Sequence, residues 1–300
     1  MAKKPVKKFA VKPGNKVDLA DYETAWVMDE KLMTDGGEAA VKEQAAEILE
    51  KNKSAMAAAQ ELLWASNSYA VLVIFQGMDA AGKDGTIKHV MSGVNPQGCK
   101  VQSFKVPTPE EIDHDFLWRY SRCLPGRGEI GIFNRSYYED VLVPRVHPQI
   151  LDAYRLPTHR RNDKFWRDRY KDINAFERHL SLNGTLILKF FLHISKEEQR
   201  KRLLDRLDNR DKLWKFSPTD LQERDYWDDY VKAYEAMLAA TSTKHAPWYV
   251  IPSDHKWAAR ALVAEMIASE IRRLDLEYPK VGPDAMKVID ASRAKLEKEK

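Results

Sequence analysis

The residues with the clearest chemical purpose in this chain are Lys83 and the glycines before it. Gly77 and Gly82 stand five positions apart and Lys83 follows directly, in the pattern Gly-x-x-x-x-Gly-Lys. In a phosphate-binding loop, backbone N–H groups converge on phosphate oxygens, a helix N-terminus adds partial positive charge and the lysine supplies a full charge. The residues predicted to bind phosphate are Gly77, Ala80, Ala81, Gly82, Lys83, Asp84, Gly85 and Thr86.

Two carboxylates distinguish this loop from the usual pattern. The position after the lysine normally carries Ser or Thr, whose hydroxyl holds Mg²⁺, and here it is Asp84. Asp79 is a second acid inside the loop. Because phosphates repel carboxylates unless a metal ion lies between them, the pair predicts that magnesium is held in an unusual way.

A second cluster follows the apolar segment that ends at Asn134. Arg135 comes directly after it, and Glu139 and Asp140 follow within one helical turn of each other. In phosphate-loop enzymes a carboxylate beyond a neighbouring strand anchors the magnesium, and either acid can do so here with Asp79 as partner. Arg135 is expected at the carboxyl end of the sheet, where such folds bind ligands. The alternative is a strand end with solvated charges.

A third cluster consists of arginines at four-residue intervals, Arg202, Arg206 and Arg210. This spacing predicts that they share one helix face. Arg206 and Arg210 have no acid three or four residues away, so a bound anion would relieve their repulsion. We predict a lid around residues 198–224 that closes over phosphates and excludes water. Its other cations are Lys212, Lys215 and Arg224.

Four more cations lie near these clusters in the sequence, namely Lys88, Lys105, Arg119 and Arg122. This amount of positive charge around one phosphate loop indicates a donor or acceptor that is itself highly anionic.

The elements that must position these residues alternate along the chain. Strand-like sequence occurs at 71–75, 100–104, 129–134, 185–194 and 248–251, and helical sequence at 38–66, 112–123 and 163–182. Ser195 to Glu198 reads as a capping box that begins another helix. Around 219–240, Trp227, Tyr230, Tyr234 and Leu238 recur at helical spacing, which favours core positions over ligand contacts. The pattern predicts the α/β class, with a three-layer αβα P-loop kinase-like fold, a parallel sheet and a helical lid.

The two ends differ in composition from the rest. Residues 1–20 begin with a run of lysines without acids and are predicted to be a basic disordered arm. A single phosphotransferase domain is expected over 21–275, with a tail at 276–300.

Composition excludes several classes of protein. Hydrophobic residues make up 44% of the chain, and no apolar stretch approaches the roughly 20 residues that cross a bilayer. A net charge of +4 is too small to argue for nucleic acid. The two cysteines, Cys99 and Cys123, have no metal-ligand spacing and are expected to be reduced packing residues in a cytoplasmic protein.

Several segments together resemble the polyphosphate kinase 2 family. They are residues 77–86, 104–108, 114–119, 133–140, 214–221 and 241–248, in the family's order, over about 45–270. The family's loop normally carries an acid, as at Asp79, and tolerates a residue without a hydroxyl after the lysine, as at Asp84. Asn134 stands where many relatives have Asp.

The resemblance implies reversible phosphoryl transfer between inorganic polyphosphate and a nucleotide, with Mg²⁺ or Mn²⁺. It implies metal binding by Asp79 and Asp140, and contacts of Lys83 and Arg135 with the transferred phosphate. These four residues are the predicted catalytic set. The implied polyphosphate- and nucleotide-binding residues are Lys88, Lys105, Arg119, Arg122, Glu139, Arg202, Arg206, Arg210, Lys212, Lys215 and Arg224. Family members resemble thymidylate kinases in fold and form dimers or tetramers, so a homo-oligomer is expected.

The expected reaction converts ADP or GDP to ATP or GTP. The alternatives are transfer to AMP and an ATP-dependent nucleoside monophosphate kinase on the same scaffold. A non-catalytic polyanion binder, which uses the basic arm, is the alternative from another class.

Overall fold

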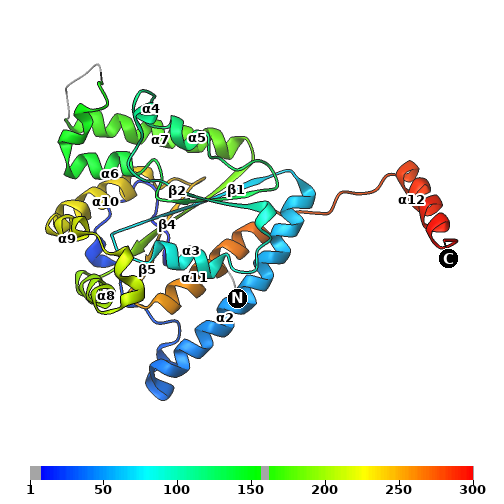
Figure 1. The fold of residues 1–300 in the computed structure, drawn as a ribbon, viewed down its shortest axis with the longest axis horizontal. Coiled ribbons are helices and arrows are strands. Elements are labelled where there is room, and N and C mark those ends of the chain that lie inside the picture. The colour runs from blue at the N-terminus through cyan, green and yellow to red at the C-terminus, as the bar shows by residue number, and fades with distance from the viewer. Residues whose placement is uncertain (1–7, 157–161, 300) are drawn as a thin grey trace.

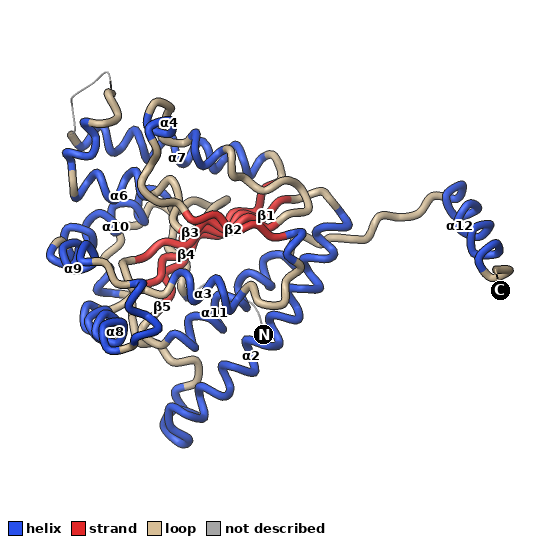
Figure 2. Tube along the Cα trace, viewed as in Figure 1, coloured by secondary structure: helices blue, strands red, loops and turns tan. Residues whose placement is uncertain are grey.

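A twisted, fully parallel sheet forms the centre of the molecule. The computed structural model describes residues 8–156 and 162–299, except for the side chain of Lys215. Its strands are β1 (Ala70–Gly77), β2 (Cys99–Ser103), β3 (Ile130–Asn134), β4 (Thr185–His193) and β5 (Trp248–Pro252), in the order β2-β3-β1-β4-β5 (Figure 2). Strands β1 and β3 are buried throughout their length, as expected for parallel strands with helices on both faces. The five predicted strands are confirmed.

Helices cover both faces of the sheet and complete the predicted three layers (Figure 1). One face carries α2 (Glu30–Ser66), α3 (Lys83–Val90) and α11 (Lys256–Arg272). The other carries α6 (Glu139–Val146), α7 (Asp163–Leu182) and α10 (Trp227–Thr241). Gly37, with φ of 71°, kinks α2, and α7 occupies the residues that its helical sequence predicts.

Shorter elements connect these layers. They are η1 (Leu19–Asp21), η2 (Pro96–Gly98), α4 (Pro109–Ile112), α5 (Trp118–Ser121) and η3 (Pro148–Asp152). The single helix predicted over 112–123 is wrong, because the chain forms α4 and α5 there with a turn between them. Asp115 accepts the backbone N–H of Leu117 at 2.9 Å in this turn, and such a side-chain bond competes with helix continuation.

The predicted lid region is helical and stands beside the carboxyl ends of the strands. It comprises α8 (Lys196–Asp208), η4 (Arg210–Lys215) and α9 (Pro218–Asp225) (Figure 1). Ser195 caps α8 by accepting the N–H of Glu198, as the sequence predicts. The reciprocal bond of the predicted capping box is replaced, because the Ser195 N–H donates to Asp254 and Glu198 accepts from Arg202.

Residues 8–20 of the predicted disordered arm are instead ordered, and that part of the prediction is wrong. Phe9, Val11, Val17 and Leu19 are buried, and Ala10 forms an antiparallel bridge with Tyr249 on strand β5. Apolar residues alternate with polar ones among the lysines of this stretch, and their side chains cover the edge of the sheet. The first seven residues of the arm lie outside the described part of the chain.

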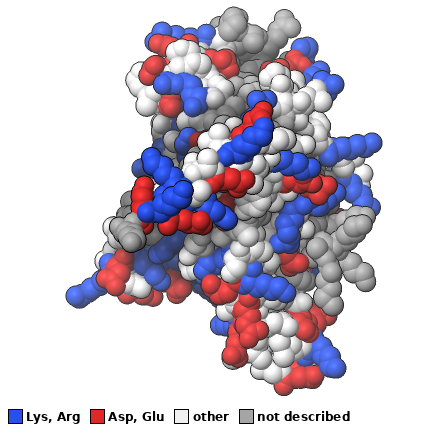
Figure 3. All heavy atoms as spheres, turned by 90° about the vertical axis from the view of Figure 1, so that its right-hand side faces the viewer, with Lys and Arg blue, Asp and Glu red and all other residues white. Residues whose placement is uncertain are grey.

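The C-terminal tail leaves the body and ends in α12 (Pro283–Leu296), whose residues are all exposed (Figure 1). Within the described residues both cysteines are free, and no helix is long and apolar enough to span a membrane. On the face in Figure 3, basic and acidic side chains are interspersed, so this face lacks the single-sign field that attracts nucleic acid.

Candidate active site

The phosphate loop connects β1 to α3 in a conformation that only small residues adopt easily. Gly82 and Ala80 have φ of 105° and 60°, and a Cβ on Gly77 would lie 2.8 Å from the carbonyl oxygen of Leu192. A positive φ costs a residue with a side chain roughly 1–2 kcal/mol, so Ala80 is held there by its surroundings.

Lys83 begins α3 with its side chain folded back along the loop. It is 8% exposed, and its Nζ donates to the carbonyl oxygens of Gly77 and Met78 at 2.5 and 3.2 Å. Burial and the neighbouring Arg135 lower its pKa to about 8. Within the described residues its hydrogen-bond acceptors are carbonyl oxygens rather than carboxylates, so its charge remains available to attract an anionic ligand.

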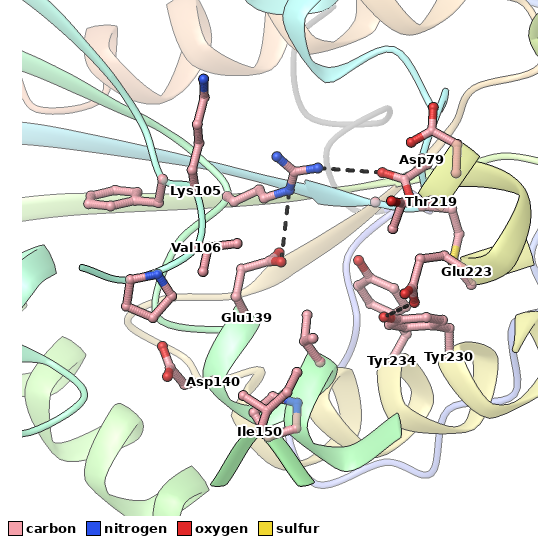
Figure 4. Close-up of a pocket in the computed structure, with 18 of the residues that line it drawn as sticks. Asp79, Lys105, Val106, Glu139, Asp140, Ile150, Thr219, Glu223, Tyr230 and Tyr234 are labelled. Atoms are coloured by element: carbon pink, nitrogen blue, oxygen red, sulfur yellow. Dashed lines mark hydrogen bonds and ion pairs between the residues drawn. The ribbon is translucent and has the colours of Figure 1, made fainter. Parts of the chain in front are cut away.

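Arg135 follows β3 and joins the two acids nearest to the loop. Its guanidinium lies 3.4 Å from Asp79 and 3.8 Å from Glu139 (Figure 4). Arg135 has a φ of 64°, which is a strained value. Its backbone N–H donates to the carbonyl oxygen of Phe75 at 3.1 Å and so stabilises this conformation. Burial raises the pKa of Glu139, and the charge of Arg135 opposes that shift. The sequence cluster 135–140 and the loop therefore meet at this arginine.

Asp140 occupies a different part of the site from the one predicted for it. It lies across the cavity from Asp79, with Glu139 between them (Figure 4). Its carboxylate is 6% exposed and accepts the hydroxyls of Tyr120 and Tyr154 at 2.9 and 3.1 Å. Glu139 and Asp140 are consecutive at the start of α6 and point in different directions, so Glu139 faces Arg135 while Asp140 faces the two tyrosines. The structure therefore does not bring Asp140 to the side of the cavity where Asp79 lies (Figure 4).

Asp84, one of the two unusual acids of the loop, contacts Asn134 at the end of β3. The Asn134 side-chain amide donates to Asp84 at 2.5 Å. The second carboxylate that is usual at the strand end would repel Asp84, whereas an amide pairs with it. Asp84 and Asn134 thus form a hydrogen-bonded pair that links the start of α3 to the end of β3.

A cavity of about 580 Å³ opens beside the loop. Its lining includes the charged residues Asp79, Arg135 and Glu139 and the apolar residues Phe104, Val143, Pro144 and Ile150. Figure 4 shows Asp79 and Ile150 on different sides of the cavity. Such a cavity, with an apolar wall and a charged end, has the size and character of a small-molecule site.

The residues of α10 pack in or against the core, as their helical spacing predicts, and its aromatic side chains also line this cavity. Trp227, Tyr230 and Tyr234 line it, while Leu238 is fully buried in the core. Tyr230 donates to Glu223 of α9 at 2.7 Å, and His147 contacts the same carboxylate at 2.8 Å. Helical periodicity alone could not separate a core face from a cavity wall, since both are apolar.

The lid arginines do not form the predicted row, because α8 ends at Asp208 and Arg210 lies in η4. Arg206 is paired rather than free, at 3.0 Å from Asp220, an acid 14 residues along the chain that local spacing cannot reveal. Arg202 is 5% exposed and points at the phosphate loop. Arg224 lines the cavity and contacts α8, and Lys212 is exposed.

The remaining predicted cations divide into cavity and surface residues. Lys105 and Arg119 line the cavity, and Arg119 donates to the carbonyl oxygen of Lys105 at 2.9 Å. Lys88 is exposed on α3, and Arg122 is exposed and lies over the ring of Trp118 at 4.6 Å. The structure places neither of these two among the residues that line the cavity.

The residues present fit a hard cation that takes most of its ligands from phosphate and water. In the described parts of the chain no three His, Cys, Asp or Glu side chains gather into a metal site. Asp79 is a partly exposed carboxylate in the loop, and Mg²⁺ is commonly bound by one or two carboxylates plus substrate phosphates.

Comparison with known proteins places this arrangement in a family. A sequence model of the polyphosphate kinase 2 family matches residues 39–279. An ADP-polyphosphate phosphotransferase of Rhodopseudomonas palustris is 50% identical over 97% of this chain and 98% of its own length. An AMP/ADP-polyphosphate phosphotransferase of Meiothermus ruber is 43% identical over 95% of this chain and 99% of its own.

A solved structure shares the whole fold. The crystal structure of polyphosphate kinase 2 from Arthrobacter aurescens superposes with a TM-score of 0.84 at 38% identity, and covers 97% of this chain and 98% of that one.

Proposed function

Because this chain belongs to the polyphosphate kinase 2 family and transfers phosphoryl groups between polyphosphate and a nucleotide, we propose that its acceptor is a nucleoside diphosphate, ADP or GDP. The observation that carries the proposal is the junction of two sites at Arg135. The guanidinium joins the phosphate loop, through Asp79, to a cavity large enough for a nucleotide. The relative at 50% identity is an ADP-polyphosphate phosphotransferase, which supports the diphosphate class.

Lys83, Arg135 and the loop amides bind and orient the phosphoryl group in transfer. The attacking oxygen belongs to a nucleotide phosphate that is already ionised near neutral pH. No general base is therefore needed, and the residues act by positioning and charge neutralisation. Asp79 would hold Mg²⁺, for which Mn²⁺ can substitute, and the bound metal neutralises charge on the phosphates.

The nucleotide fits the cavity with its phosphates toward Arg135 and its base toward the apolar wall. Glu139 and Asp79 keep the Arg135 guanidinium in place, while Tyr230, Tyr234 and Trp227 close the side that faces α9. Lys105 and Arg119 lie on the opposite side, within reach of a second anionic chain.

The test is ATP formation by purified protein supplied with polyphosphate, Mg²⁺ and either ADP or AMP, with Lys83→Ala as the inactive control. We expect ATP from ADP and no product from AMP. ADP formation from AMP would move the acceptor to the monophosphate or dual class. GDP in place of ADP measures base selectivity.

The metal is tested separately with Asp79→Asn. We expect the variant to fold normally and to lose most of its activity. It should also lose the Mn²⁺ binding that electron paramagnetic resonance detects in wild-type protein with tripolyphosphate. Normal Mn²⁺ binding by this variant would remove Asp79 from the metal site.

A cytoplasmic location and a homo-oligomer, dimer or tetramer, remain predictions from the sequence and its family resemblance. Sedimentation of the full chain measures the oligomeric state directly.

A further inference from the structure

Helix α8 faces the phosphate loop with two buried side chains, Gln199 and Arg202. They are 3% and 5% exposed. Gln199 donates to the carbonyl oxygen of Asp79 at 2.9 Å, and Arg202 donates to those of Ala80 and Ala81, both at 3.0 Å. Three consecutive carbonyl groups of the loop are therefore fixed by one helix of the lid region.

Arg202 has no donor left for a phosphate. A guanidinium has five N–H donors. Besides the two loop carbonyls, Arg202 donates to Glu198 at 2.8 Å and to the carbonyl oxygens of Ser253 and Asp254 at 2.5 and 3.0 Å. All five donors are used inside the protein, which does not suit the role of phosphate ligand that the sequence suggests.

The bonds to the carbonyls determine where the loop amides point. In a trans peptide the C=O of one residue and the N–H of the next point in opposite directions. With the carbonyls of residues 79–81 held toward α8, the amides of 80–82 point away from it. The Ala81 amide donates to Met78 at 3.1 Å, whereas those of Ala80 and Gly82 have no acceptor among the described residues. Two free amides thus face the side on which an anion would bind.

A second lid helix supports the same contact. Arg224 of α9 donates to Gln199 Oε1 at 2.6 Å and to the carbonyl oxygen of Lys196 at 2.9 Å. Because Gln199 Oε1 accepts from Arg224, the side-chain NH₂ group of Gln199 points toward Asp79 as a donor. The chain from α9 through Gln199 to the loop connects the lid to the phosphate site.

We propose that Gln199 and Arg202 are positioning residues that hold the phosphate loop in its anion-binding conformation by fixing the carbonyl groups of Asp79, Ala80 and Ala81. The inference rests on the proposed role of this loop as the polyphosphate site. It differs from a lid that binds the substrate directly, because these side chains act through the loop backbone.

Arg202→Lys separates the two roles. Lysine keeps the charge but has only three donors, so at least two of the five bonds are lost. We expect about tenfold weaker binding of tripolyphosphate by calorimetry, a lower kcat, and an unchanged slope of log affinity against log salt concentration. Gln199→Met, which changes no charge, should act in the same direction.

The matched control is Arg200→Lys together with Arg200→Met. Arg200 is on the same helix, is exposed and pairs only with Glu197, at 2.9 Å, among the described residues. Both control variants should bind tripolyphosphate as the wild type does. Circular dichroism and thermal unfolding of every variant separate loss of folding from loss of loop geometry.

Two results would overturn the proposal. One is wild-type binding by Arg202→Lys combined with a salt slope reduced by about one charge in Arg202→Met, the behaviour of a direct phosphate contact. The other is wild-type binding by a folded Gln199→Met. If the wild type binds tripolyphosphate but phosphorylates no nucleotide, the proposed function fails. Weaker binding by the variants would still support the positioning role.

Discussion

Lys83 and Lys189 are both buried lysines, one in the phosphate loop and one in the middle of strand β4, and their partners differ. Lys83 donates to two backbone carbonyls. Lys189, which is fully buried, donates to Glu177 at 2.6 Å and to the Tyr138 hydroxyl and the Thr241 carbonyl, both at 2.8 Å. Burial lowers the pKa of both lysines and nearby carboxylates oppose the shift in both, but among the described residues only Lys189 donates a hydrogen bond to one of them.

The difference shows how a buried charge can be assigned to function or to structure. The carboxylate of Glu177 also accepts the hydroxyls of Tyr137 and Tyr138 at 2.8 and 2.7 Å, so that network is complete within the protein. The ammonium group of Lys83 donates to no carboxylate among the described residues, so a bound anion would be its first hydrogen-bonded negative partner. A buried cation with carbonyl partners alone is therefore the better marker of an anion site.

The largest effect should come from Lys83→Met. Loss of a preorganised charge at the transferred phosphate should reduce kcat/KM by about 10³-fold or more. The free energy of unfolding should change little, because no carboxylate loses a hydrogen-bonded partner and the relieved desolvation of the lysine offsets its lost attraction to Asp79 and Glu139. Turnover with polyphosphate and ADP, beside urea unfolding, checks both statements. A variant that is inactive only because it is unfolded would contradict the comparison.

Glu177→Leu should have the opposite profile. Removal of one partner of a buried ion pair leaves Lys189 uncompensated and should cost about 3–5 kcal/mol of stability. Urea unfolding measures this loss. Addition of Lys189→Met should recover part of it, since the double variant has no unpaired charge. A cost below about 1 kcal/mol for the single variant would show that the network contributes little.

The stability of the unliganded protein should rise with pH through Lys83. Its pKa is about 8 when folded, against about 10.4 in an unfolded chain, so between these values the unfolded state binds more protons. The contribution grows by up to about 1.4 kcal/mol per pH unit over this window and is absent below it. The measurement is the difference in unfolding free energy between the wild type and Lys83→Met from pH 7 to 10. A flat difference would refute the lowered pKa.

The smallest effect is expected at an exposed lysine, which sets the lower limit of the comparison. Lys100 pairs with Glu129 at 2.7 Å, but its side chain is 66% exposed. Lys100→Met should change the free energy of unfolding by less than about 1 kcal/mol and leave activity unaltered. Chemical denaturation measures this change. A larger loss would mean that solvent screens this ion pair less than its exposure indicates.

The sequence by itself determined the strands, the phosphate loop and the family. Strand β1 begins with an uninterrupted apolar run from Ala70 to Phe75, and the loop glycines are required by local backbone geometry. Both signals lie within a few consecutive residues, so they can be recognised without knowledge of the fold. The same holds for α7, whose helical sequence is uninterrupted.

Only the tertiary structure decided which charges are available to a substrate. Arg206 forms an ion pair with Asp220, and Asn134 donates to Asp84. Arg202 donates to carbonyl groups more than 50 residues away in the sequence. Whether a side chain binds a ligand depends on the groups that surround it after folding. The sequence shows which residues are neighbours along the chain. It does not show which residues the folded sheet and lid bring into contact.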